Sequence, residues 1–290
     1  MINKVTDMKI LTLNTHSLVE PDYENKLKLF VEMIIKERPD VFALQEVNQL
    51  MAAAEVYPEE EYVEVYRFKG KIREDNHAYR VSRMLKEAGL SYYWTWIGAK
   101  KGYDIYDEGM ALFSLTPILE TRQFYISQSQ CYSNWKARKV LGIKTGEKPE
   151  WYFCVHMGWW DDKEDPFATQ WDNFQEELKI QVLWNQKIWL LGDFNSPASN
   201  EDQGYGYVKK HGWKDTWDLA EKKDSGVTVE KEIDGWRDRK ASGSPAVIGM
   251  RLDYIWCNYD AKVRTYQVVF NGANYPVVSD HYGIMIEVEK

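Results

Sequence analysis

Short apolar runs separated by turn residues and polar segments dominate this sequence and limit the folds open to it. Each run has about five to eight residues, the usual length of a β-strand. The segments that we predict as strands are 8–14, 41–47, 109–114, 138–145, 151–157, 188–194, 251–258, 263–270 and 282–289. A chain with this many strands must build large sheets.

Helical periodicity is confined to the segments 23–38, 78–88 and 170–184. In the first of them Leu27 and Ile34 share an apolar face. The order is strand, helix, strand at the start and mostly strands later. That order fits two sheets packed face to face with helices outside better than a doubly wound parallel sheet, which alternates regularly. We therefore predict an α/β fold of two packed sheets.

The segment 197–249 differs from the rest of the chain because it is rich in Gly, Asp, Lys and Ser and has little periodicity. We expect surface loops there, with a short helix near 213–222. Loops of this length are often functional. With 290 residues, 44% of them hydrophobic, the chain can form one substantial core. No repeat or linker interrupts it, so we predict one domain over 1–290, with two small domains as the alternative.

The net charge of −8 disfavours a duplex nucleic-acid partner, because such proteins use basic surfaces to neutralise phosphates. A catalytic metal can make a site locally positive, so a nuclease stays an alternative. No run approaches the roughly 18 apolar residues of a membrane span, and the N-terminus lacks a secretion signal. We expect a cytoplasmic protein without a membrane partner. Cys131, Cys154 and Cys257 have no metal-ligand spacing and are expected to be buried core residues.

Polar side chains end or interrupt many of the predicted strands. They are Asn14, Glu46, His156, Asp193, Asn195, Asp253, Asp280 and His281. Burying carboxylates without partners is costly, and a shared divalent cation would satisfy them. Oxygen ligands without thiolates favour Mg²⁺ or Mn²⁺ over Zn²⁺. Asp193 and Asn195 stand two positions apart in an extended chain, so both can face one water molecule.

Each of these residues also has an ordinary structural interpretation. Asp-Phe-Asn after a strand is typical of an Asx turn, and Glu46 or Asp280 can cap a following segment. His156 can be a core histidine, and Arg251 with Asp253 can form a surface ion pair of little energetic value. One shared site explains all of them together, whereas the ordinary interpretations are separate coincidences.

Several sequence blocks resemble, in order, those of the endonuclease/exonuclease/phosphatase superfamily. They are TLNTH (12–16), ALQEV (43–47), EGMALFS (108–114), HMG (156–158), GDFN (192–195), RLDYI (251–255) and SDH (279–281). The resemblance spans about residues 8–288. It implies a four-layered α/β sandwich, with two mainly antiparallel sheets flanked by helices, and a Mg²⁺ site that cleaves phosphate esters.

The resemblance implies a role for each acid and amide at the strand ends. Glu46 is the expected principal metal ligand, with Asn14 beside it and Asp280 as a further metal-site carboxylate. Asp193 is expected to orient or deprotonate the attacking water, and Asn195 to hold a phosphoryl oxygen or that water. The implied chemistry is an in-line displacement that needs no nucleophilic serine or cysteine.

The resemblance also assigns the imidazoles. His281 is expected to face the phosphate, with Asp253 orienting it and raising its proton affinity. His156 is expected to act as a second imidazole on the phosphoryl group, oriented by Glu108. Nuclease members of the superfamily often carry an acid two positions after the asparagine, where this chain has His16, and this departure weakens a two-metal assignment.

The aromatic residues bear on the substrate. The chain has 13 Trp and 19 Tyr, and Trp159 and Trp160 follow His156 closely. Such rings can stack on sugars, although they also fill cores and stack on nucleotide bases. The loop HxGWW...DPFxxQW resembles the branch of maltose 6'-phosphate phosphatases, which implies a small phosphorylated sugar as substrate. A phosphatase also needs a cationic side chain that binds the phosphate. The candidates are Lys136, Arg138, Lys139 and Arg251, of which we select Arg138.

Three functions therefore follow from the sequence. The first is a Mg²⁺-dependent sugar-phosphate phosphatase. The second is a Mg²⁺-dependent nuclease, which the acidic charge and His16 disfavour. The third is a binding module of the same fold without activity, which the full set of blocks disfavours.

Overall fold

Two large sheets form the centre of the molecule in the computed structural model, which describes residues 7–59, 61–230 and 249–290. The seven-stranded sheet has the order β12 (Lys222–Lys223), β14 (Val263–Val269), β15 (Gly283–Val288), β1 (Met8–Asn14), β2 (Val41–Leu50), β6 (Tyr106–Ser114) and β5 (Tyr93–Gly102). The six-stranded sheet has the order β11 (Lys214–Asp215), β13 (Asp253–Cys257), β10 (Ile188–Asp193), β9 (Glu150–His156), β8 (Lys139–Thr145) and β7 (Glu120–Tyr125). The short strands β3 (Glu55–Val56) and β4 (Ile72–Arg73) pair separately.

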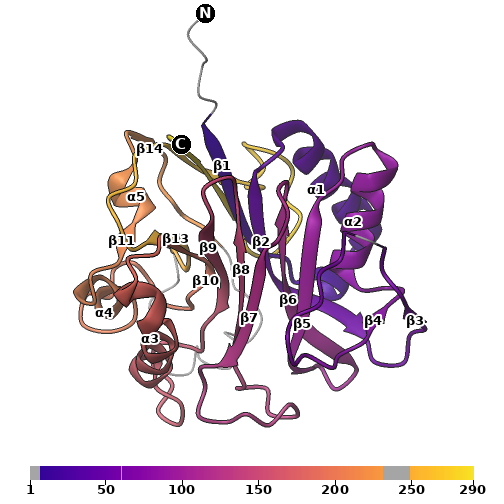
Figure 1. Cartoon of the computed structure of the whole chain (residues 1–290), viewed down its shortest axis with the longest axis horizontal. Coiled ribbons are helices and arrows are strands. Elements are labelled where there is room, and N and C mark those ends of the chain that lie inside the picture. Colours follow the sequence, from indigo (N-terminus) through magenta and orange to yellow (C-terminus); the bar gives the residue numbers. More distant parts are fainter. Residues whose placement is uncertain (1–6, 60, 231–248) are drawn as a thin grey trace, which may run out of the picture.

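The helices cover the outer faces of the two sheets. Figure 1 shows α1 and α2 on one side of the molecule and α3, α4 and α5 on the other. Their bounds are η1 Ser17–Val19, α1 Tyr23–Glu37, α2 His77–Glu87, α3 Phe167–Leu183, α4 Tyr205–Lys210 and α5 Thr216–Leu219. Most strand pairs are antiparallel, the exceptions being β1 with β2, β9 with β10 and β12 with β14. The predicted four-layered α/β sandwich is confirmed.

Three apolar clusters correspond to the three interfaces between the four layers. The central cluster joins the sheets through residues such as Ile10, Leu112 and Leu191. In the second, Phe30 of α1 packs on the outer side of the seven-stranded sheet. In the third, Trp171 of α3 packs on the six-stranded sheet. Alternate residues of a strand face opposite sides, so each sheet supplies two of these interfaces.

Most predicted elements are confirmed, with their ends shifted by a few residues. The expected short helix near 213–222 is present as α5, whereas α4 was not predicted. Residues 231–248 of the predicted loop segment lie outside the described residues. The strands β5 and β7 were not predicted. The prediction that all three cysteines are buried is wrong for Cys131, which is exposed, while Cys154 and Cys257 are buried. No helix in the described ranges is long and apolar enough to cross a membrane.

The strand directions bring distant parts of the sequence to one rim. The parallel pair β1 and β2 ends there, as does the parallel pair β9 and β10, in which Asp193 lies opposite His156. The antiparallel β13 begins at the same rim, with Asp253 opposite Asp193. Across the two sheets, β1 contacts β10 and β2 contacts β9. The strand ends of one sheet therefore face the strand ends of the other.

Candidate active site

Two carboxylates and one amide form the centre of the rim. The Asn14 side chain donates to Glu46 Oε1 at 2.9 Å and to Asp193 Oδ2 at 3.2 Å, and so links one sheet to the other. The amide oxygen of Asn14 accepts the backbone N–H of His16 at 3.2 Å. In this orientation Asn14 holds the two carboxylates together through its nitrogen, while its oxygen is used by the backbone.

Glu46 reaches the rim through an irregularity in its strand. The pairing of β2 with β6 shifts register between Leu44 and Val47, and Glu46 has a φ of 51°. A β-bulge turns a side chain away from the regular alternation, and bulges are frequent beside active sites. A positive φ costs a residue other than glycine about 1 kcal/mol or more, so the surrounding structure must stabilise it. The bulge directs Glu46 to the site at the expense of local regularity.

Asp193 is buried at the end of β10. Its Oδ1 accepts the backbone N–H of Asn195 at 2.7 Å, while Nδ2 of Asn195 donates to the carbonyl of Met157 at 3.0 Å. Burial raises the pKa of Asp193 to about 7, the charge of Asp253 adds to the rise, and His281 opposes it. A carboxylate with this pKa can take and release a proton near neutral pH.

His281 and Asp253 form a buried pair. The Nδ1 atom of His281 lies 2.9 Å from Asp253 Oδ2, and its Nε2 lies 3.9 Å from Asp193 Oδ2. Burial disfavours the imidazolium, but the charges of Asp253 and Asp193 outweigh burial and raise the pKa of His281 well above its ordinary value. Asp253 therefore holds His281 in its protonated form.

The pKa of His156 is shifted in the opposite direction from that of His281. The Nε2 atom of His156 lies 3.8 Å from Asp193 Oδ2 and 4.0 Å from Glu46 Oε1. Burial, followed by the charges of Arg138 and Lys100, lowers the pKa of His156 well below its ordinary value. The expected partner, Glu108, is instead paired with the ammonium group of Lys100 at 3.1 Å. β5 places Lys100 directly opposite Glu108 on β6, and the orientation of His156 by Glu108 stays a prediction.

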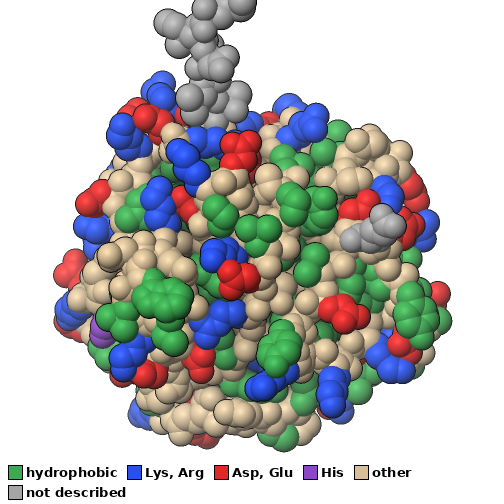
Figure 2. All heavy atoms as spheres, viewed as in Figure 1, with side chains coloured by type: hydrophobic (Ala, Val, Ile, Leu, Met, Phe, Trp, Pro, Cys, Tyr) green, Lys and Arg blue, Asp and Glu red, His purple; other side chains and the backbone are tan. Residues whose placement is uncertain are grey.

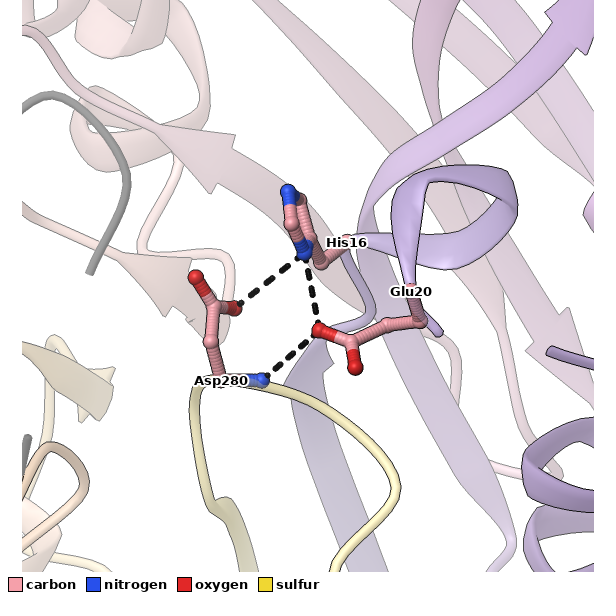
Figure 3. A group of neighbouring side chains, drawn as sticks. All are labelled: His16, Glu20 and Asp280. Carbon is pink, nitrogen blue, oxygen red and sulfur yellow. Dashed lines mark hydrogen bonds and ion pairs between the residues drawn. The ribbon is translucent and has the colours of Figure 1, made fainter. Parts of the chain in front are cut away.

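Asp280 lies next to His16 and Glu20, as Figure 3 shows. The Nδ1 atom of His16 is 2.8 Å from Glu20 Oε1 and 4.0 Å from Asp280 Oδ1, and Glu20 Oε1 also accepts the backbone N–H of Asp280 at 3.1 Å. Burial opposes the charge of His16, but the hydrogen bond with Glu20 and the charges of Asp280 and Glu46 raise its pKa to about 9. His16 therefore lies between the acids Glu20 and Asp280.

A cavity of about 380 Å³ opens at this rim. Among the predicted site residues, its lining includes Glu46, Glu108, Arg138, His156, Trp159, Asp193, Asn195, Asp280 and His281. Asn14 and Asp253 stand behind the lining and contact it through hydrogen bonds. Trp160 is partly buried against the apolar cluster under α3 and lies beside the ring of Trp159, and its contact with the substrate stays a prediction.

The other cationic candidates have different partners. Arg251 forms a short ion pair with the buried Asp215, which replaces the surface pair with Asp253 considered from the sequence. Lys139 lies over the ring of Tyr125. Lys136 lines the cavity and pairs with Asp162 at 2.8 Å.

The sequence analysis missed several cavity residues, namely Lys100, Lys101, Tyr103 and Trp135. The first three lie at the end of β5 or just after it, in a segment that appeared polar and turn-like. The alternating aromatic residues of YWTWIG, which begins β5, were the signal for this strand. Trp135 is 60% exposed and lies in the connection between β7 and β8, where no sequence pattern marked it.

The donor set fits a hard divalent cation. Glu46 and Asp280 offer carboxylate oxygens, and the described lining of the cavity contains no thiol. Burial raises the pKa of Glu46, and the charges of Glu108 and Asp280 add to the rise, because these acids repel one another. A divalent cation beside Glu46 would relieve that repulsion, so the residues present fit Mg²⁺ or Mn²⁺.

A two-sheet sandwich whose acids, amides and imidazoles meet at one rim defines a class of hydrolases that act on phosphate esters. The chain belongs to the Endonuclease/Exonuclease/phosphatase family, whose profile matches residues 11–281. Members of this family are phosphoesterases and generally depend on metal ions.

Solved structures similar to this chain agree with the family. An endonuclease/exonuclease/phosphatase family protein from Leptotrichia buccalis C-1013-b is 30% identical, with a TM-score of 0.80 over 98% of this chain and 100% of that one. A mannosyl-6-phosphatase from Bacteroides thetaiotaomicron VPI-5482 is 17% identical, with a TM-score of 0.65 over 97% and 99% of the chains.

The fold also occurs in a 3' phosphatase from Neisseria bound to a product DNA hairpin. That protein is 16% identical, with a TM-score of 0.59 over 98% of this chain and 100% of that one. At such identities the likeness concerns the fold alone. None of the curated proteins matches this chain.

Proposed function

We propose that this chain is a phosphatase that depends on a divalent cation and hydrolyses the phosphate monoester of a small sugar, such as maltose 6'-phosphate. The composition of the cavity carries the proposal. Acids and imidazoles meet there with two buried cations, Lys100 and Arg138, and with the aromatic side chains of Trp135 and Trp159. Sugar rings present apolar C–H faces that pack on such side chains, while the cations attract the phosphate.

In the proposed reaction, a water molecule attacks phosphorus in line with the leaving sugar oxygen. Asp193 accepts the proton of this water, for which its pKa of about 7 is suitable. The sugar oxygen leaves and takes a proton from solvent, which gives inorganic phosphate and the free sugar. His281, held protonated by Asp253, stabilises negative charge on the phosphoryl oxygens.

The remaining residues position the reacting groups. Asn14 fixes the distance between Glu46 and Asp193, and Asn195 holds the strand end against Met157 while one of its amide hydrogens stays available. Mg²⁺ or Mn²⁺ held by Glu46 and Asp280 would polarise the phosphoryl oxygen and offset its charge. We propose that the whole chain, 1–290, works as one catalytic domain.

The alternative of a nuclease receives less support. The net charge is −8, and Figure 2 shows Lys and Arg interspersed with Asp and Glu over the face in view rather than gathered in a continuous stripe. DNA binding at physiological salt depends on many such contacts to phosphates. A binding module without activity is the least supported alternative, since the acids, amides and imidazoles needed for hydrolysis meet in one cavity.

A substrate panel tests the proposal. With Mg²⁺, the protein should release phosphate from maltose 6'-phosphate and from hexose 6-phosphates faster than from glycerol 3-phosphate, and it should leave plasmid DNA and a 3'-phosphorylated DNA hairpin intact. Trp135→Ala should raise KM for the sugar phosphates by about 10-fold, the loss of one stacking contact, with little change for glycerol 3-phosphate. Trp184→Ala is the matched control, because Trp184 is 73% exposed at the end of α3. Preferred turnover of DNA would contradict the proposal.

A further inference from the structure

Arg138 is a buried cation with unused hydrogen-bonding capacity. The residue is 8% exposed and lines the cavity just before β8 begins. Its Nη1 donates to the carbonyl oxygens of Trp135 at 3.1 Å and Ala137 at 3.3 Å, and its Nε is buried without a hydrogen-bond partner. Within the described residues, no carboxylate forms an ion pair with Arg138, whereas Arg122 pairs with Glu177 at 3.1 Å. Asp165, which also lines the cavity, acts on Arg138 through its charge without forming an ion pair with it. A buried guanidinium without a paired carboxylate is costly, so a ligand is expected to complete it.

Lys100 is the second buried cation on this wall of the cavity. It is also 8% exposed, and it lies 3.1 Å from Glu108, its partner across β5 and β6. Arg138 and Lys100 lie close enough to act on each other and on His156 through their charges. The acids that act on these two cations are Glu108 and Glu46 for Lys100 and Asp165 for Arg138, and among the described residues only Glu108 lies within ion-pair distance. Lys100 and Arg138 line the same cavity as the acids Glu46, Asp193 and Asp280.

Two cations in the lining of one cavity can discriminate between kinds of phosphate ester. Near neutral pH a monoester carries a charge of about −1.5 to −2 and three terminal oxygens, because its second pKa is about 6. A diester carries one charge and only two terminal oxygens. A guanidinium presents a planar fork of donors that matches two oxygens at once, and an ammonium adds a third contact.

We propose that Arg138 and Lys100 bind the third terminal oxygen of a phosphate monoester and neutralise its additional charge. Through these contacts they make the site selective for monoesters over diesters. This inference rests on the proposed phosphatase function and specifies its ester class.

The test compares two substrates with the same leaving group, 4-nitrophenyl phosphate and bis(4-nitrophenyl) phosphate. Arg138→Met keeps the length of the side chain and removes its charge, and it should lower kcat/KM for the monoester by about 100-fold but for the diester by less than about 5-fold. Arg138→Lys should recover part of the loss. Lys100→Gln should change selectivity in the same direction. Arg122→Met, on β7, is the control and should leave both rates unchanged.

Binding gives an independent measurement. The inhibition constant of inorganic phosphate should rise by about 10-fold or more in Arg138→Met, while circular dichroism and thermal unfolding establish that the variant is folded. Equal losses for both substrates in a folded variant would overturn the selectivity but leave the phosphatase function standing. A wild-type protein that cleaves only the diester, or neither substrate, would overturn both.

Discussion

At the scale of single residues, the site depends on two histidines held in different protonation states. Both are buried within 4 Å of Asp193, yet the pKa of His281 is raised and that of His156 is lowered. The difference comes from their neighbours, since His281 has Asp253 at 2.9 Å while His156 lies near Arg138 and Lys100. One imidazole is thereby a cation and the other a neutral donor or acceptor.

The pair of Asp253 and His281 makes a pH prediction. Because the pKa of His281 in the folded state lies above its unfolded value, the pair stabilises the fold fully below about pH 6.5, and this contribution is lost as pH rises through the folded-state pKa. Asp253→Asn removes the charge, so burial lowers the pKa of His281. The alkaline limb of the kcat/KM profile should then move to lower pH, with a loss of about 100-fold at pH 8.

The exposed Asp260 supplies the control for this experiment. Its carboxylate pairs with Lys214 on the surface, so Asp260→Asn should leave the pH profile as it is in the wild type. If Asp253→Asn lowered kcat/KM by the same factor at every pH, Asp253 would support the fold without setting the charge of His281.

Sequence reasoning identifies residues that end strands but not the contacts between strands. Asp193, Asp253 and His281 stand out because charged or polar side chains interrupt apolar runs. The pairing of Glu108 with Lys100 could not be found in this way, since it depends on the register of β5 against β6. The same holds for Asn14, whose link to Glu46 and Asp193 depends on which sheets face each other.

At the scale of elements, the end of β10 requires glycine. Gly192 has a φ of 147°, and a Cβ atom there would lie 2.0 Å from the carbonyl oxygen of Val155 on the adjacent β9. This oxygen belongs to the parallel pairing that sets Asp193 opposite His156. The close approach of the two backbones therefore positions two site residues.

Gly192→Ala should consequently damage both stability and activity. We expect a loss of at least about 2 kcal/mol in the free energy of unfolding, measured by urea denaturation, because backbone must move to admit the methyl group. Gly212→Ala is matched to it, since Gly212 also has a positive φ, 87°, but has no atom within 4 Å of the added Cβ. It should cost about 1 kcal/mol and leave activity intact. Similar effects of the two substitutions would contradict this account of β10.

Elements with a regular pattern are predicted well from the sequence, and irregular ones are not. The apolar run of β10 and the periodic apolar face of α1 were enough to predict these two elements. β7 (Glu120–Tyr125) was missed because its residues are polar and partly exposed at the edge of a sheet. β5 was missed because it ends in Lys-Lys-Gly, which sequence patterns associate with loops.

At the scale of the whole molecule, the active site is a product of topology. Parallel pairing of β1 with β2 and of β9 with β10 directs four strand ends to one rim, and the antiparallel β13 and β15 begin there. The order of the elements predicted the layers, the polar strand ends indicated a shared metal site, and the family resemblance implied the role of each residue in it. Composition and periodicity alone do not define strand direction or order.

The central claim is that this rim hydrolyses phosphate esters through a divalent cation and the carboxylate of Asp193. The most direct measurement is the rate of inorganic phosphate release from maltose 6'-phosphate by the wild type and by Asp193→Asn, each with Mg²⁺ and with EDTA. We predict release only by the wild type with Mg²⁺, and a fall of at least about 1,000-fold in the folded variant. Release that persists in EDTA, or that Asp193→Asn leaves unchanged, would contradict the account.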